Sequence, residues 1–131
     1  MREAVKMKLG SKEYSLLPTF GVVDAFEDRH YGLLEHLECL MGGKATIHAR
    51  AFLILQGLKA GSPDVQWDMS AVMERLFEQG YWHEDVVLVE AEFIERMLYT
   101  PEQFIAKKEQ RATEEEGLEK IFATMSQTSS E

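Results

Sequence analysis

The chain has 131 residues, 45% hydrophobic and 28% charged, proportions that match soluble globular proteins and exclude wholesale disorder. This length suits one domain with appendages and is too short for two independent cores. The formal net charge is -9, and residues 64–100 hold nine Asp or Glu against two Arg. Because nucleic-acid binding depends on cationic side chains at the phosphates, this acidity argues against a DNA or RNA partner.

Residues 1–19 form the first predicted unit, an N-terminal β-hairpin. Apolar residues alternate with lysines from Val5 to Leu9, residues 10–13 provide a turn, and a second strand runs until Pro18. A two-stranded hairpin is marginal alone in water, so it must lie on helices or pair with a neighbouring chain. Exposed strand edges are also natural joints between subunits, which predicts a homo-oligomer.

Residues 20–105 form the second predicted unit, a helical core domain. Apolar spacing and capping residues predict helices over 20–29, 33–41, 46–59, 69–79 and 84–99. The residues expected to be buried are Phe52, Leu55, Leu76, Phe77, Val89 and Phe93. Three methionines at the same spacing are also expected in the core: Met69, Met73 and Met97.

Residues 106–131 form the third unit, a polar C-terminal helix and tail. The helix should begin at the capping box Thr100-Pro101-Glu102-Gln103, with Phe104 and Ile105 reaching the core. Residues 107–116 are nearly all polar and can carry the helix about 15 Å outward at ~1.5 Å per residue. Beyond them lie the partner-binding candidates, spaced like anchors of a helix in a groove: Leu118, Ile121, Phe122 and Met125. Alternatively, Gly117 permits a turn that folds these residues back onto the domain.

The predicted fold class is therefore mainly α: a compact helical domain of about five to six helices, with an N-terminal β-hairpin and an extended C-terminal helix. No signal-peptide pattern follows Met1, and the longest apolar run, Ala51 to Leu55, is far too short to span a membrane. A single cysteine, Cys39, favours a reducing compartment. We therefore expect a soluble cytoplasmic protein with no membrane partner.

A search for chemistry yields no catalytic, cofactor-binding or metal-binding residues. Glu27 and His30 have the Glu-x-x-His spacing of di-iron bundles, but a second copy of that motif is absent from the sequence. Gly42-Gly43-Lys44 lacks the pattern of a phosphate-binding loop and is better interpreted as a helix stop. The sequence therefore indicates a protein that works by binding other proteins, without a cofactor.

The order of these segments resembles a known family. The hairpin Val5 to Leu16 leads through Leu17-Pro18-Thr19-Phe20 into a helix containing Ala25-Phe26-Glu27-Asp28-Arg29. An Ala-Phe-Leu-Ile-Leu-Gln-Gly-Leu helix (Ala51 to Leu58) and the helix end Met73 to Tyr81 follow. Over roughly Val5 to Met97 the chain looks like the small tail assembly chaperones of long-tailed bacteriophages and the related gene-transfer-agent proteins.

This resemblance implies a non-enzymatic protein of the host bacterial cytoplasm that is absent from the mature virion. Its implied partners are the tape measure protein, which it coats, the tail tube protein, which it helps to recruit, and a longer product of ribosomal frameshifting. The acidity of the chain is compatible with a partner rich in lysine and arginine. Two alternatives are a structural tail or adaptor subunit retained in the virion and an enzyme fragment with a borrowed metal.

Overall fold

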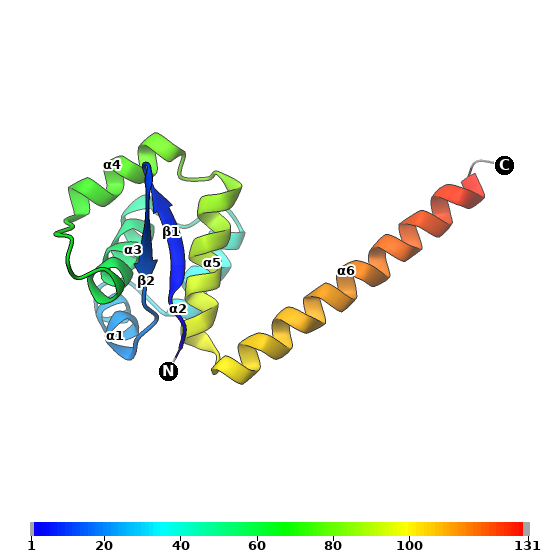
Figure 1. The fold of residues 1–131 in the computed structure, drawn as a ribbon, viewed down its shortest axis with the longest axis horizontal. Coiled ribbons are helices and arrows are strands. Elements are labelled where there is room, and N and C mark those ends of the chain that lie inside the picture. Colours follow the sequence, from blue (N-terminus) through cyan, green and yellow to red (C-terminus); the bar gives the residue numbers. More distant parts are fainter. Residues whose placement is uncertain (1, 130–131) are drawn as a thin grey trace.

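A compact body and one long projecting helix make up the molecule, as the computed structural model of residues 2–129 shows (Figure 1). Side chains are described for residues 2–121 and 123. The strands are β1 (Val5–Leu9) and β2 (Lys12–Leu16). The helices are α1 (Phe20–Arg29), α2 (Leu33–Met41), α3 (Ile47–Gly61), α4 (Met69–Gln79), α5 (Glu84–Leu98) and α6 (Pro101–Ser129). The mainly α fold class with a hairpin and an extended last helix is confirmed.

Local side-chain caps fix where several helices begin. Thr19, Thr46 and Asp68 each accept a hydrogen bond from the backbone N–H three residues on, at 3.2, 3.2 and 2.8 Å. At α6 the predicted capping box forms in both directions: Gln103 N donates to Thr100 Oγ1, and Thr100 N donates to Gln103 Oε1. Because these bonds are local, the helix starts follow from the sequence alone.

The hairpin lies flat on the helices, with β1 against α5 and β2 against α3 (Figure 1). Its strands pair antiparallel from Val5 opposite Leu16 to Leu9 opposite Lys12. Val5, Met7, Leu9 and Leu16 are buried, which accounts for the stability of an otherwise marginal hairpin. At the turn Gly10 has φ +71°, which a glycine adopts without strain.

Close approach between β2 and α3 depends on glycines in the helix. A Cβ added at Gly61 would lie 2.3 Å from Ser15 O, and one at Gly57 would lie 2.6 Å from the Phe93 ring. The short distance lets Leu17 N donate to Gly57 O at 3.2 Å and lets the Ser62 hydroxyl bond both backbone groups of Ser15. The outer edge of β2 is therefore already partly hydrogen-bonded to its own chain.

Most of the expected core is confirmed, because Phe52, Leu55, Leu76 and Phe93 are all buried. Phe77 is not: its side chain is 76% exposed. The reason is that α4 packs on α3 and β1 through one stripe, with Val72 and Leu76 buried, and no element covers the flank where Phe77 lies within the described chain.

Four further expected core positions differ in degree. Val89, Met69 and Met73 are half-buried, whereas Met97 is buried as expected. Phe104 reaches the body but Ile105, one residue round the helix, is 56% exposed. The four positions that differ are Val89, Met69, Met73 and Ile105. They lie at the margins of the apolar stripes of their helices, where the spacing predicts which face is apolar but not how far burial extends around the helix.

The C-terminal helix α6 runs without interruption from Pro101 to Ser129. Gly117 stays within the helix, and its φ is not among the positive values found at three other glycines, so the turn considered above does not form. Figure 1 shows α6 leaving the body beside α5 and extending far from it. Among the described residues, no helix is both long and apolar enough to cross a membrane.

We predict that Gly61→Ala lowers the free energy of unfolding by about 1–3 kcal/mol, because the new methyl group would overlap the Ser15 carbonyl. Urea unfolding followed by circular dichroism measures this change. Gly117→Ala is the matched control, since no described atom outside its own helical backbone and chain neighbours lies within 4 Å of its Cβ position. The control should leave the unfolding of the body unchanged, and equal effects of the two substitutions would contradict the packing argument.

Candidate functional site

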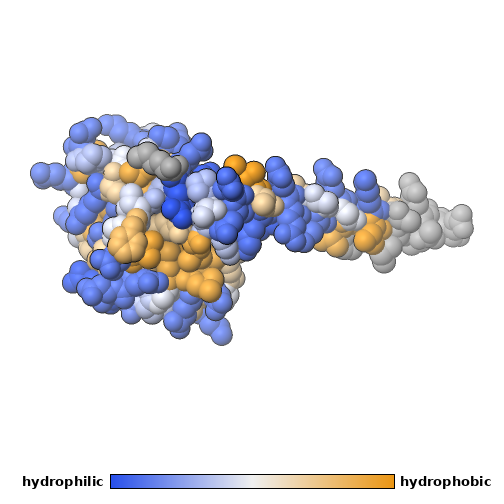
Figure 2. Space-filling view, turned by 90° about the horizontal axis from the view of Figure 1, so that it is seen from below, coloured by the Kyte–Doolittle hydropathy of each residue, from blue (hydrophilic) through white to orange (hydrophobic). Residues whose placement is uncertain are grey.

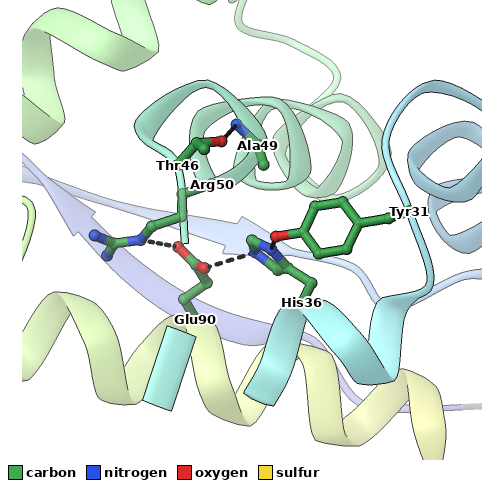
Figure 3. A network of polar contacts seen from close by, with 6 residues as sticks. All are labelled: Tyr31, His36, Thr46, Ala49, Arg50 and Glu90. Atoms are coloured by element: carbon green, nitrogen blue, oxygen red, sulfur yellow. Dashed lines mark hydrogen bonds and ion pairs between the residues drawn. The ribbon is translucent and has the colours of Figure 1, made fainter. Parts of the chain in front are cut away.

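A chain of polar side chains crosses the core of the body (Figure 3). Glu90 on α5 is at its centre: Oε1 accepts from Arg50 Nε at 3.0 Å, and Oε2 lies 3.2 Å from His36 Nε2. The other ring nitrogen of His36 is 2.8 Å from the Tyr31 hydroxyl. His36, Arg50 and Glu90 are each fully buried, so one carboxylate joins α2, α3 and α5.

Aromatic rings complete the surroundings of Arg50. Its guanidinium carbon lies 4.6 Å from the centroid of Trp82 and 5.9 Å from that of Tyr81, within the range of cation–π attraction. The two terminal nitrogens are buried and have no hydrogen-bond partner among the residues that the structure describes. Stabilisation of the charge therefore comes from Glu90 and from these rings, contributed by the segment between α4 and α5.

Tyr31 stays protonated at every physiological pH. Burial, followed by the charge and hydrogen bonding of Cys39, raises the pKa of Tyr31 to about 12. A phenol that donates to His36 Nδ1 leaves the Nε2 hydrogen to be donated to Glu90. Because His36, Arg50 and Glu90 are fully buried, we interpret the network as a structural element that fixes how three helices meet.

This network is absent from the sequence-based predictions, although a signal was present. Glu90 lies four residues after Val86 and three before Phe93, on the buried stripe of α5. His36 is placed in the same way between Leu33 and Leu40 on α2. Polar residues on buried stripes must find partners, so three such positions together predict a shared network.

Glu27 and His30, the pair with the Glu-x-x-His spacing, take part in helix capping and in aromatic packing. Glu27 Oε2 accepts from Leu33 N at 2.8 Å and so caps the start of α2. His30 stacks on Phe26 with ring centroids 5.2 Å apart and lies 5.1 Å from the Phe52 ring. In the part of the chain that the structure describes, no cluster of three or more His, Cys, Asp or Glu side chains could hold a metal ion.

The partner-binding candidates lie on the projecting part of α6. Leu118 and Ile121 are 54% and 57% exposed. The side chains of Phe122 and Met125 lie outside the described residues. Figure 2 shows apolar surface on the helix well beyond the body, separated from it by hydrophilic residues. That these residues bind a partner stays a prediction.

Polar contacts hold the first three turns of α6 to the body. Arg111 donates from both terminal nitrogens to the Glu95 carboxylate, each at 3.0 Å, and this bidentate bond raises the pKa of Arg111. Arg96 stacks over Phe104 at 4.4 Å, and Lys107 donates to the Tyr99 hydroxyl at 2.7 Å. From residue 112 onward the helix extends about 27 Å, at ~1.5 Å per residue, to Ser129.

A second surface feature is a cavity of about 310 Å³ where the end of α1 meets α3 and the start of α4. Phe52, Met69 and Met73 give it apolar walls. Arg29, His30 and His48 also line it. We call this site the basic cavity. Burial, followed by repulsion from His36, Arg29 and His48, lowers the pKa of His30 below its usual 6.5.

Comparison with known protein families, curated proteins and solved structures finds no match to this chain.

We predict that Glu90→Leu lowers the free energy of unfolding by about 3–5 kcal/mol, because the Arg50 charge would stay buried without its counter-ion. The double variant Arg50→Met/Glu90→Leu should regain much of that loss, since an apolar replacement of a buried pair is often neutral. Urea unfolding measures both. Glu92→Gln, at a partly exposed ion pair, should cost under about 1 kcal/mol. A double variant as unstable as the single one would contradict this account.

We predict that His30 makes the body less stable in acid. A histidine whose pKa is lowered by folding stabilises the protein fully above about pH 6.5, and this contribution is lost as the pH falls below that value. Thermal unfolding between pH 7.5 and 5 should therefore show a decline that is shallower in His30→Gln. Identical slopes for the two proteins would show that the charge on His30 does not affect folding.

Proposed function

We propose that this protein is a tail assembly chaperone of a long-tailed bacteriophage or prophage. It binds the tape measure protein and helps to recruit tail tube subunits, through protein contacts and without catalysis. It acts in the host bacterial cytoplasm and is absent from the mature virion.

The observation that carries this proposal is the exposure of two apolar side chains, Leu118 and Ile121, on the projecting part of α6. Exposed apolar residues on a helix that its own body does not cover are suited to helix-in-groove or helix-pairing contacts. A long helical tape measure protein offers such contacts repeatedly along its length. The likeness of segment order over Val5 to Met97 supports the same function independently.

Electrostatics supports the proposal in a second way. The residues that flank Leu118 are strongly acidic, with Glu114, Glu115, Glu116 and Glu119 against Lys120. A partner rich in lysine and arginine would be attracted to this segment, whereas phosphate backbones would be repelled.

We predict that the triple variant Leu118→Ser/Ile121→Ser/Phe122→Ser loses binding to the tape measure protein at least tenfold, the scale expected for loss of hot-spot side chains. Co-expression with a tape measure protein, followed by affinity capture, measures this loss. The melting temperature of the body should not change. A clear drop in melting temperature would show that the segment packs on the body.

The matched control replaces exposed apolar residues of the body, Leu34, Met41 and Leu88, with serine, and it should retain binding. Mass spectrometry of purified particles tests the chaperone function itself. Stoichiometric presence of the protein in virions would overturn the proposal in favour of a structural tail subunit.

A further inference from the structure

The arm, defined as residues 112–121 of α6, presents acidic and apolar side chains on one stripe. Glu114 and Glu115 precede Leu118 by four and three residues, and Glu114 precedes Ile121 by seven, so these side chains share one side of the helix. Figure 1 shows that this part of α6 stands clear of the body. The arm therefore offers two apolar anchors and two carboxylates to another molecule.

The basic cavity carries the positive charge of Arg29 beside two histidines, and like the arm it combines polar and apolar side chains. Phe52 is almost fully buried at its base, Met69 and Met73 are half-buried at its walls, and Arg29 and His48 are exposed at its rim. The cavity has a volume of about 310 Å³, the size of a small binding cleft. The Arg29 guanidinium contacts the Phe52 ring face at 5.3 Å, which leaves its nitrogens able to bind a carboxylate.

We propose that the arm of one copy of this chain docks in the basic cavity of a second copy, with Leu118 and Ile121 against Phe52, Met69 and Met73, and with Glu114 and Glu115 facing Arg29 and His48. The arm and the basic cavity, with their complementary charged and apolar side chains, are both present in every copy of the chain. Helices α1, α3 and α4, which line the cavity, lie on the side of the body away from α6, so a continuous helix cannot bring its own arm there (Figure 1).

Two other sites on the body are less suited to the arm. The outer edge of β2 is occupied in part by Ser62 and Gly57, so it has few free backbone groups. A cavity at the root of α6 is also basic, but Arg2 there donates to Tyr99 O and Arg96 pairs with Glu92 and stacks on Phe104. The basic cavity is the site where cationic groups face open space beside an apolar wall.

An arm that leaves one side and docks on the other makes a heterologous, head-to-tail contact. Such contacts close into rings or continue as helical filaments, in contrast to a symmetric dimer. The docked arm uses the same Leu118 and Ile121 as the proposed tape measure contact, so the two contacts compete for one arm. Assembly needs only the purified chain, so its test is separate from the test of tape measure binding.

Disulfide trapping tests the docking directly. In a Cys39→Ser background, Leu118→Cys and Met73→Cys proteins are prepared separately, mixed and oxidised. We expect cross-linked dimers that contain one copy of each variant, formed at least tenfold faster than dimers in either protein alone. Preferential cross-linking of Leu118→Cys to itself would overturn the proposal in favour of paired arms. Absence of any cross-link, with the chain monomeric by sedimentation at high micromolar concentration, would also overturn it.

Charge exchange tests the specificity of the contact. Arg29→Glu/His48→Glu and Glu114→Lys/Glu115→Lys should each weaken self-association at least tenfold, and mixing the two proteins should restore it as a one-to-one complex. The controls Lys44→Glu and Glu109→Lys reverse exposed charges outside the cavity and the stripe and should associate as the unmodified protein does. Folding of each variant is checked by thermal unfolding. Failure of the mixture to restore association would overturn the assigned pairing.

Discussion

The carboxylate of Glu90 is the interaction on which the arrangement of the body depends. It lies fully buried between Arg50 and His36 and so joins α2, α3 and α5. Of these helices, α3 and α5 support the hairpin, and α5 also contacts α6. A buried ion pair contributes little net stability compared with apolar packing, but its geometry is demanding. Only a limited set of helix rotations lets all three side chains meet. We therefore interpret the network as a determinant of helix register.

The rotation of α5 in the core also decides which of its residues face the surface and α6. With Glu90 turned inward, the buried stripe of α5 includes Ala91 and Ile94, and Val89 moves to the margin. The same rotation presents Glu95 and Glu92 to α6, where Arg111 and Lys108 pair with them. The direction of the projecting helix thus follows from the way α5 is held in the core. The buried Glu90 carboxylate and the exposed part of α6 are therefore linked through α5.

The surface combines acidity with scattered apolar exposure. Apolar side chains gather on the face seen in Figure 2. Three aromatic residues of the body are exposed: Phe20, Phe77 and Trp82. Exposed aromatic residues are enriched at protein interfaces. Together with α6, which extends about 27 Å from residue 112 to Ser129 at ~1.5 Å per residue, these surfaces support the proposed function, in which the protein makes several contacts at once.

The sequence by itself determined where the elements begin and end. Thr19, Thr46, Asp68 and Thr100 accept hydrogen bonds within their own segments, and the alternation around Gly10 defines the hairpin, so neighbouring residues suffice to specify them. The polar stretch before Leu118 favoured a segment that stands away from the core over one that folds back at Gly117, and Leu118 and Ile121 are exposed in the structure. A helix segment whose residues are polar on every side is expected to stand in solvent, and the composition of the segment alone indicates this.

Only the tertiary structure decided which side of each helix is covered. Phe77 and Ile105 fit an apolar stripe, yet both are exposed, because no element of the described chain packs over that flank. The partners of Glu90 lie 40 and 54 residues away, and the two helices that flank the basic cavity beside α3 meet only in space. Contacts between residues distant in sequence depend on how helices rotate against one another, which local spacing does not encode.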